Sequence, residues 1–183
     1  MSEKLADIQY NFINLPSRIE FENGHVISYL YDADGIKLRT THIIGSDTTV
    51  TDYCGNVIYE NGIPVKLLTE AGYVTLADSK YHYFVQDHLG NNRVVVDQSG
   101  NVEEVNHYYP FGGLLSSSVS NAVQPYKYNG KELDRKNGLD WYDYGARMYD
   151  AALGRWHVVD PMSEKYYSWS PYTYCKNNPV LRI

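Results

Sequence analysis

The chain has 183 residues, which is enough for one domain, or two very small ones, with a real hydrophobic core. Its formal net charge of −6 and its scattered Lys and Arg residues argue against nucleic-acid binding, which usually relies on a basic patch. No stretch approaches the roughly 18 apolar residues of a membrane span. Residues 1–7 lack the basic and apolar regions of a signal peptide. We therefore expect no nucleic-acid partner, no membrane span and no signal peptide in this chain.

Tyrosine dominates the aromatic composition, with 19 Tyr against 4 Phe and 3 Trp. Tyrosine favours β-strands, and its hydroxyl requires either water or a hydrogen-bond partner. This composition predicts half-buried sheet faces rather than a core made of aliphatic side chains.

Turn signals recur at short intervals along much of the chain. Asn-Gly and Asp-Gly supply the positive φ angles that two-residue hairpin turns require. Between the turns lie segments with strand character, and in Val26–Tyr31 alternation places Ile27, Tyr29 and Tyr31 on one face. The pattern predicts an all-β fold, a meander of antiparallel hairpins. The signals are Asn23-Gly24, Asp34-Gly35, Gly45-Ser46, Gly55-Asn56, Asn61-Gly62, Gly90-Asn91, Ser99-Gly100, Gly112-Gly113, Asn129-Gly130 and Asn137-Gly138.

Helical periodicity is scarce. The best candidate is one short helix at residues 161–167, because Pro161 stands early and Glu164 lies in the first turn. The Ser-rich stretch Leu114–Asn121 is predicted to be a surface loop.

Three segments repeat one design, in which an acid or Tyr precedes a Gly-centred turn and a return strand. They are Tyr31–Leu38, Asp52–Tyr59 and Asp87–Val94. In this design Asp or Asn caps its own turn, and Gly adopts the positive φ. The turn residues of interest are therefore Asp32, Gly35, Gly90 and Asn91.

The Tyr31-Asp32 pair followed by Gly35 resembles the YD repeat of Rhs and teneurin-type proteins. A longer ordered series resembles the Rhs repeat-associated core in its Bacteroidetes-like form, over about residues 81–180. Residues 10–80 resemble less regular YD repeats. The core series consists of Tyr109–Gly112, Tyr126–Glu132, Gly138–Asp150, Leu153–Trp156, Asp160-Pro161 and Pro171–Val180.

The resemblance implies both a fold and a function. In the family, YD hairpins spiral into a hollow β-shell that the core closes at one end, and the shell commonly encloses a C-terminal toxin. We thus expect irregular YD-like hairpins over residues 1–80 and a core-like region over 81–183, in one continuous β domain. The expected partners are the rest of such a shell and a toxin, and the expected location of the parent protein is secreted or cell-surface.

The family core also resembles a self-cleaving aspartyl protease that uses two Asp-Pro elements. Only the upstream element, Asp160-Pro161, matches here. Because the second element and the toxin do not appear in this sequence, we expect the chain to be either a fragment or the product of a shortened gene. We therefore expect Asp160 to be structural, capping the short helix, and the chain to be non-enzymatic. A remnant autoprotease centred on Asp160 is the alternative.

The Gly-Arg-aromatic segments favour structural roles for Arg147 and Arg155, which can stack on aromatic rings and pair with carboxylates such as Asp143 or Asp150. The other residues expected to be structural are assigned from the core-like motifs. They are Tyr142, Gly145, Tyr149, Asp150, Gly154, Pro161, Asn177, Asn178 and Pro179.

The remaining polar residues give no signature of a cofactor or metal site. The six histidines lack metal-ligand spacing, although His82 and His88 could meet across a hairpin. Cys54 and Cys175 form no CxxC pair; a bridge between them stays open, and two isolated thiols are the favoured interpretation.

Two further interactions are expected as alternatives. Exposed tyrosines with Trp141, Trp156 and Trp169 could stack on glycans of a cell surface, although lining of sheet faces is favoured. A few hairpins also leave sheet edges open, which predicts either a homo-oligomer or coverage of an edge by residues 113–125.

Overall fold

A computed structural model describes residues 4–116, 119–120 and 124–182. The chain forms two compact units. The first comprises residues 1–83, 97–100 and 135–139, and the second comprises residues 84–96, 101–134 and 140–183. The long N-terminal run of hairpins thus belongs to the first unit, and most of the core-like motifs belong to the second.

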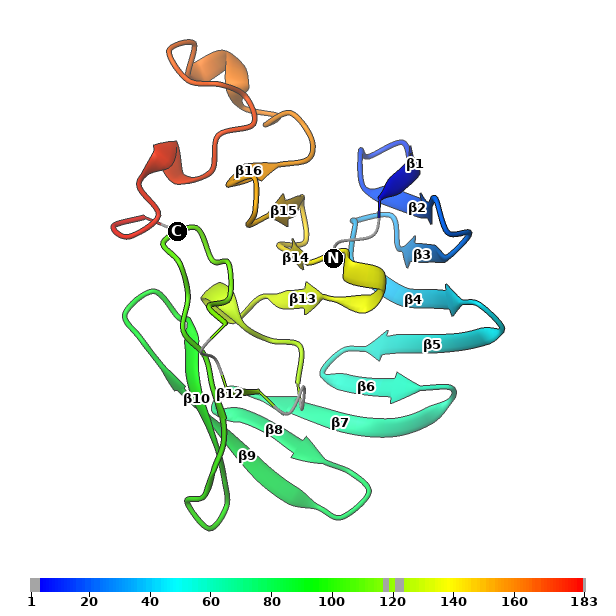
Figure 1. Cartoon of the computed structure of the whole chain (residues 1–183), viewed down its shortest axis with the longest axis vertical. Helices are drawn as coiled ribbons and strands as arrows, with labels where there is room; N and C mark the ends of the chain where they lie inside the picture. The colour runs from blue at the N-terminus through cyan, green and yellow to red at the C-terminus, as the bar shows by residue number, and fades with distance from the viewer. Residues whose placement is uncertain (1–3, 117–118, 121–123, 183) are drawn as a thin grey trace. The chain divides into compact units, whose positions relative to one another are not determined.

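Antiparallel strands dominate, as the turn spacing predicts, and the order of β1 to β12 in their sheet follows the order in the sequence (Figure 1). Strands β13 to β16 form a second sheet in the same sequential manner. The strands are β1 (Leu5–Tyr10), β2 (Pro16–Phe21), β3 (Val26–Tyr31), β4 (Lys37–Ile44), β5 (Asp47–Cys54), β6 (Val57–Glu60), β7 (Ile63–Thr69), β8 (Gly72–Thr75), β9 (Lys80–Gln86), β10 (Asn92–Asp97), β11 (Val102–Val105), β12 (Val119–Ser120), β13 (Glu132–Asp134), β14 (Trp141–Asp143), β15 (Met148–Asp150) and β16 (Arg155–Trp156).

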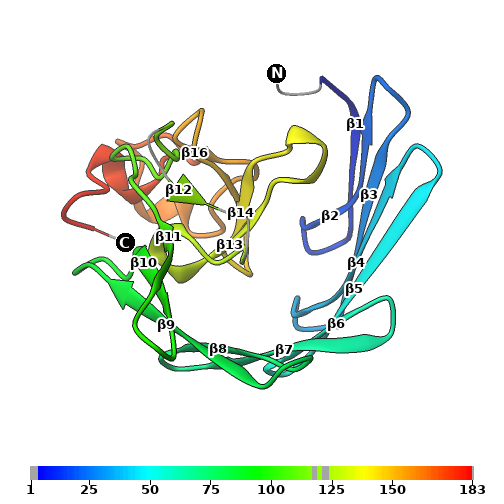
Figure 2. The ribbon, with the colours of Figure 1, turned by 60° about the horizontal axis from the view of Figure 1, so that its bottom comes forward.

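Register explains which face of the first unit is buried. Ile27 on β3 lies opposite both Ile19 on β2 and His42 on β4, so these three side chains share one face. All three are buried, and Tyr29, two residues after Ile27, is buried with them. The alternation predicted for β3 is therefore confirmed at Ile27 and Tyr29, whereas Tyr31 is only half-buried. The sheet of this unit curves between β4 and β8 (Figure 2).

The repeated turn design is confirmed at the first repeat. Asp32 Oδ1 accepts hydrogen bonds from the N–H groups of Asp34 and Ile36, at 2.9 and 2.8 Å. Gly35 has φ +84°, and a Cβ there would lie 3.2 Å from the Ile13 side chain. In the second repeat the acid acts differently: Asp52 lies within β5 and pairs with Arg39 on β4 at 2.5 Å. The sequence pattern therefore overstated the similarity of the repeats.

The predicted helix at residues 161–167 is reduced to a single 3-10 turn, η3 (Ser163–Lys165). Three further 3-10 turns were not predicted: η1 (Tyr128–Gly130), η2 (Lys136–Gly138) and η4 (Cys175–Asn177). Each of these three contains non-glycine residues at positive φ, and no helix continues from them. Such residues are poor continuations of a right-handed helix, which explains why each turn ends at once.

The predicted surface loop at residues 114–121 contains a strand. Strand β12 pairs with β11 through Glu104↔Ser120 and Val105↔Val119, so part of the 113–125 segment covers the edge of β11. Residues 117–118 and 121 of the predicted loop lie outside the described residues.

The second unit is organised around aromatic side chains. Tyr142 on β14 lies opposite Tyr149 on β15, which in turn lies opposite Trp156 on β16. These side chains point into one core because opposite residues of an antiparallel pair share a face. The buried members of this cluster are Tyr128, Leu133, Tyr142, Tyr149, Trp156 and Tyr174.

Candidate functional site

Three tyrosine hydroxyls of the second unit hold one short backbone segment. Tyr128 donates to the carbonyl oxygen of Pro110 at 2.9 Å, Tyr149 to that of Phe111 at 2.8 Å, and Tyr142 to that of Gly112 at 2.9 Å. We call this arrangement the tyrosine clamp. Burial raises the pKa of Tyr128 and of Tyr149 above the ordinary value, so these hydroxyls stay protonated and remain donors. Phenylalanine could fill the same space but could not satisfy the carbonyls, which explains the preference for Tyr.

The clamped segment approaches the tyrosine rings closely. Gly112 has φ +88°, and a Cβ at this position would lie 2.6 Å from the ring of Tyr128. A Cβ on Gly154 would lie 3.0 Å from the Phe111 ring. Both glycines therefore allow backbone to lie against an aromatic ring, in addition to any turn that they form.

Asn129 connects the tyrosine core to a neighbouring turn. Its Oδ1 accepts hydrogen bonds from the hydroxyls of Tyr144 and Tyr174, at 2.6 and 2.8 Å. Its Nδ2 donates to the carbonyl of Leu89, and its backbone N–H donates to Asn91 Oδ1. Asn129 has φ +49°, a backbone conformation that asparagine tolerates better than most residues. The amide thus satisfies buried hydroxyls that would otherwise lack an acceptor.

Asn91 is in turn held by the third copy of the repeated turn. Asp87 accepts the side-chain amide of Asn91 at 2.8 Å and the backbone N–H groups of Leu89 and Asn91. Burial acts to raise the pKa of Asp87, but these hydrogen bonds hold it below its usual value. Gly90 completes the turn at φ +75°. The Asp-Asn-Gly turn design is thus confirmed here, and it also supports Asn129.

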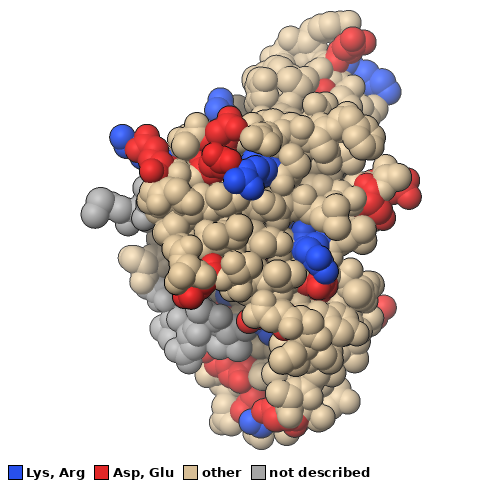
Figure 3. Space-filling view, turned by 90° about the vertical axis from the view of Figure 1, so that its right-hand side faces the viewer, with Lys and Arg blue, Asp and Glu red and all other residues tan. Residues whose placement is uncertain are grey.

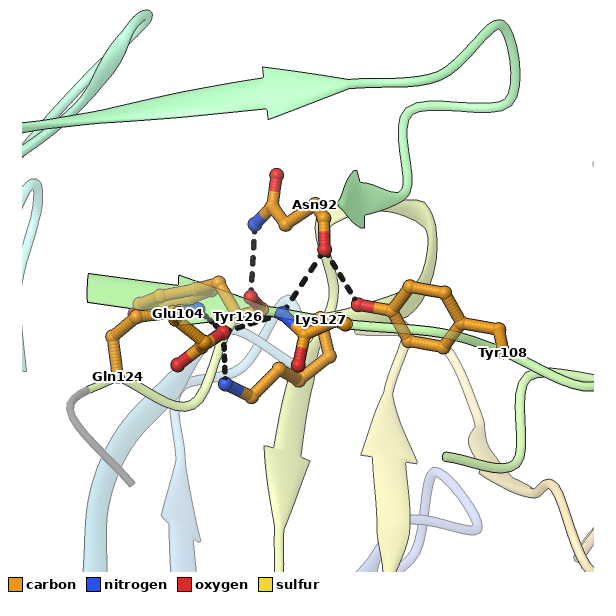
Figure 4. A network of polar contacts seen from close by, with 7 residues as sticks. Asn92, Glu104, Tyr108, Gln124, Tyr126 and Lys127 are labelled. Atoms are coloured by element: carbon orange, nitrogen blue, oxygen red, sulfur yellow. Dashed lines mark hydrogen bonds and ion pairs between the residues drawn. The ribbon is translucent and has the colours of Figure 1, made fainter. Parts of the chain in front are cut away.

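A buried ion pair lies beside this network (Figure 4). Lys127 Nζ lies 2.5 Å from Glu104 Oε1, and the two side chains are 4% and 0% exposed. Gln124 Nε2 donates to the same carboxylate oxygen at 2.9 Å, and Asn106 Nδ2 also donates to this oxygen. The side-chain amide of Asn92 donates to the Tyr126 carbonyl, and the backbone carbonyl of Asn92 accepts from the Tyr108 hydroxyl. A buried charge requires such compensation because its transfer from water is costly.

Arg147 lies in a pocket of about 300 Å³ in the second unit. Its guanidinium stacks on Trp156, 4.2 Å from the ring centroid, and Nη1 lies 3.2 Å from Asp160 Oδ2. The predicted stacking role of Arg147 is therefore present. The carboxylate beside it is that of Asp160, whereas the expectation named Asp143 or Asp150.

Asp160 shapes the turn that leads into η3. Its Oδ1 accepts the N–H of Met162 at 2.8 Å, and its carbonyl accepts the N–H of Ser163 at 2.9 Å. Pro161 occupies the second position of this turn, where its fixed φ suits the geometry. The N-cap of η3 is Met162, without a side-chain hydrogen bond, so Asp160 caps the preceding turn and not the helix as predicted. Among the described residues that line the pocket, Asp160 is the one carboxylate.

The other motif residues make local contacts within the second unit. Asp143 Oδ1 accepts the N–H of Gly145, and Asp150 Oδ1 accepts those of Ala152 and Leu153. The guanidinium of Arg155 lies 5.9 Å from the centroid of the Tyr172 ring. In the last motif Asn177 has φ +56°, Asn178 donates its N–H to the Cys175 carbonyl, and Pro179 is buried.

The cysteines are free, Cys54 exposed and Cys175 half-buried, which confirms the favoured interpretation of two separate thiols. His82 is buried, its ring stacks on Tyr73, and its Nε2 lies 2.6 Å from Thr75 Oγ1. Within the described residues no group of three His, Cys, Asp or Glu side chains is placed to hold a metal. No helix in the described part of the chain is both long and apolar enough to cross a bilayer.

Charged side chains are scattered over the face shown in Figure 3. Basic side chains lie near acidic ones in small groups there. Trp141 and Trp156 are buried, as the core-lining interpretation predicts, whereas Trp169 is 40% exposed.

The fold and its motifs agree with one family. Residues 67–180, more than half of the chain, match the family described as Teneurin YD-shell. The chain belongs to this YD-shell family. The resemblance to Rhs and YD-repeat proteins is thereby confirmed.

Relatives of this YD-shell chain are much longer proteins. Salivary gland surface protein 1 of Aedes aegypti is 31% identical over the whole chain, which spans 6% of that protein. Toxin subunit YenC1 of Yersinia entomophaga is 28% identical over 72% of the chain, which spans 15% of the subunit. Among solved structures, a mutant Photorhabdus luminescens Tc holotoxin pore and TcdB2-TccC3-TEV both superpose with a TM-score of 0.78. Their sequence identities with this chain are 20% and 18%. The superpositions cover 97% and 95% of this chain and 10% of each of the two solved chains.

Sequence reasoning missed the residues that make long-range polar contacts. Asn129 belongs both to an Asn-Gly turn signal and to the core-like motif Tyr126–Glu132, but neither pattern predicts its contacts with Tyr144 and Tyr174. Glu104 and Lys127 gave no signal, because Glu103 and Glu104 stand side by side and the sequence alone does not say which one faces inward.

Proposed function

We propose that this YD-shell chain is a structural segment of the wall and end plug of a shell, in a secreted or cell-surface protein of the polymorphic-toxin type. The remainder of the shell and a C-terminal toxin are its partners, and enclosing that toxin for use against other cells is the parent protein's task. Toxin subunits among the relatives support this proposal, as does the strand order, which follows the sequence. The chain spans only a small share of each of these relatives, so the role concerns a part of a larger assembly.

The observation that carries the proposal is the internal hydrogen bonding of five tyrosine hydroxyls in the second unit. The hydroxyls of the tyrosine clamp all donate to backbone carbonyls, and Asn129 takes up the next two tyrosine hydroxyls. Catalytic sites instead present polar groups toward a substrate. A core whose tyrosine hydroxyls are bonded internally suits a rigid wall or plug.

Two observations at Asp160 support the non-enzymatic part of the proposal. A protease that divides acid and base roles between two carboxylates requires both close together. Here the pocket holds the carboxylate of Asp160 next to the guanidinium of Arg147, and Asp160 Oδ1 already accepts a backbone N–H. Asp160 is thus engaged as a turn-forming residue.

Protease protection tests the shell role. The complete reading frame that carries this chain is expressed with its natural flanks and treated with trypsin under native conditions. An enclosing shell predicts that an internal flanking segment resists digestion in the wild type and is degraded in Tyr149→Ala, which removes a fully buried side chain. Tyr167→Ala, at a residue that is 90% exposed, serves as the control and should retain protection. Equal digestion of all flanking segments in the wild type and in Tyr149→Ala would contradict enclosure.

A further inference from the structure

The pocket beside Arg147 has the size and the lining of a small-ligand site. Its volume of about 300 Å³ lies at the lower end of the range of roughly 300–1,000 Å³ for such sites. Its walls come from the β14–β15 hairpin, β16, the η3 region and η4, all within the second unit. A pocket of this size suits a ligand of about one ring.

Two cationic side chains, Arg147 and Lys176, line the pocket, together with one carboxylate, that of Asp160. Arg147 Nη1 is buried and has no hydrogen-bond acceptor in place, although it lies in the ion pair with Asp160. Lys176 Nζ lies over the ring of Tyr166, 4.5 Å from its centroid, and Lys176 is exposed. A cation held by a ring face retains N–H groups for an anion. The charge balance of the pocket therefore favours a ligand with one negative charge.

Aromatic rings and hydroxyls make up the rest of the lining. Tyr166 and Trp169 are 45% and 40% exposed, so parts of their rings are available to a ligand. The hydroxyl-bearing side chains of Ser163, Ser170 and Thr173 line the same pocket. Exposed aromatic faces beside hydroxyl groups suit a pyranose ring, which has an apolar C–H face and a polar rim.

Backbone strain at the pocket wall supports a binding role. Cys175, Lys176 and Asn177 have φ of +48°, +50° and +56°, three consecutive non-glycine residues in the left-handed region. Such conformations are unfavourable for residues that carry a side chain, and they occur preferentially at functional sites. Glycine would relieve the cost at Lys176 but would remove its ammonium group from the pocket.

A peptide ligand fits this pocket less well, because the neighbouring backbone is already paired. The N–H of Trp156 donates to the Tyr172 carbonyl, and the N–H of Asp160 donates to the Pro171 carbonyl. Arg155 and Thr173 also form a β-bridge. These pairings occupy backbone groups that strand addition, a common way to bind an extended peptide, would use at this wall.

We propose that this pocket binds a pyranose ring that carries a carboxylate. The carboxylate lies between Arg147 and Lys176, and the ring stacks on Tyr166 or Trp169. This binding role goes beyond the proposed shell role and does not depend on it, because it concerns residues of the second unit alone.

Binding is tested by isothermal titration calorimetry of the full chain with glucuronate, with glucose as the neutral ring and acetate as the ringless carboxylate. We expect the affinity for glucuronate to be at least tenfold higher than that for glucose or for acetate. Addition of glucuronate should change the tryptophan fluorescence of the wild type but not that of Trp169→Phe. Equal affinity for glucose and glucuronate, or no binding of glucuronate, would overturn the proposal. Tighter binding of an acidic tripeptide than of glucuronate would also overturn it.

Matched variants locate the site. Lys176→Gly and Tyr166→Ala should each weaken glucuronate binding at least tenfold. Lys165→Ala and Tyr167→Ala change neighbouring residues that do not line the pocket, and they should leave binding unchanged. Lys176→Gly is informative because glycine accepts the left-handed backbone, so the variant should fold at least as stably as the wild type. Unchanged glucuronate affinity in a folded Lys176→Gly variant would contradict the assignment.

Discussion

Tyr149 donates its hydroxyl hydrogen to the carbonyl oxygen of Phe111, 38 residues earlier in the chain, at 2.8 Å. Tyr128 and Tyr142 do the same for the residues on either side of Phe111. Three neighbouring carbonyls are thus satisfied by three different segments. The tyrosine clamp therefore joins motifs that are distant in sequence into one core.

Removing one hydroxyl of the clamp should destabilise the chain measurably. Tyr149→Phe leaves the ring in place but deprives the Phe111 carbonyl of its donor, and an unsatisfied buried polar group costs about 1–3 kcal/mol. The midpoint of urea unfolding, followed by tryptophan fluorescence, measures this loss. Tyr167→Phe, at a residue that is 90% exposed, should leave the midpoint unchanged. Equal midpoints for Tyr149→Phe and the wild type would show that the hydrogen bond contributes nothing.

A pair of glycine variants separates backbone strain from steric collision. Gly112 and Gly100 have almost the same φ, +88° and +85°, but only at Gly112 would a Cβ meet another group, the ring of Tyr128 at 2.6 Å. Gly100→Ala should therefore show the strain alone, about 1 kcal/mol. Gly112→Ala should be destabilised by roughly 1–3 kcal/mol more, the usual cost of overpacking. Similar unfolding free energies for the two variants would mean that the Tyr128 ring moves aside freely.

The buried ion pair predicts an asymmetric response to mutation. Lys127→Met leaves the carboxylate of Glu104 buried without its cation, which should cost about 3–5 kcal/mol of unfolding free energy. The double variant Glu104→Leu, Lys127→Met should be more stable than Lys127→Met, because it leaves no isolated charge. Lys4→Met removes a cation from a surface pair whose atoms lie 4.0 Å apart, and it should have no measurable effect. A Lys127→Met variant as stable as the wild type would exclude a structural role for the pair.

Because the pKa of His157 is lowered by burial, we expect the folded chain to lose stability in mild acid. Burial against Trp141 lowers the pKa of His157 to about 4, with Asp150 acting in the opposite direction. The unfolded chain therefore binds a proton at higher pH than the folded chain, and stability falls as the pH drops from about 6.5 toward 4. The loss amounts to roughly 3 kcal/mol at most. His157→Gln should flatten the pH dependence of the unfolding free energy over this window, whereas His88→Gln, at an exposed residue, should not.

Asp160 should not support self-cleavage. Its carboxylate is engaged with Arg147 and with the N–H of Met162, and no second carboxylate lines the described pocket. Intact mass spectrometry after several days at neutral pH should show the full-length chain for both the wild type and Asp160→Asn. Spontaneous cleavage of the wild type that disappears in Asp160→Asn would restore the autoprotease hypothesis.

The sequence predicted local features better than contacts between distant segments. Strand alternation in β3, the capping of its turn by Asp32, and the stacking of Arg147 on an aromatic ring all follow from residue type and close spacing. The pairing of Arg147 with Asp160 does not, because it depends on the path of β16 and the following turn. The acceptor role of Asn129 was hidden for the same reason, since its partners Tyr144 and Tyr174 lie 15 and 45 residues away.

The helix prediction illustrates a different limit. Pro161 and Glu164 are typical of a helix start, but the segment lacks an apolar face of sufficient length, and isolated short helices are marginal in water. Strand pairing and turn geometry therefore determine the local structure, and only a single 3-10 turn remains at Ser163–Lys165.

The tyrosine clamp also has a consequence for synthesis on the ribosome. The carbonyls of residues 110–112 emerge before Tyr128, Tyr142 and Tyr149, so the segment cannot be fixed in its final position until the last of these has been made. At a translation rate of roughly 5–20 residues per second, the 38 residues between Phe111 and Tyr149 correspond to a delay of about 2–8 s. During that interval the strands of the first unit are already available for pairing, so we expect the nascent chain to close these hairpins before its aromatic core.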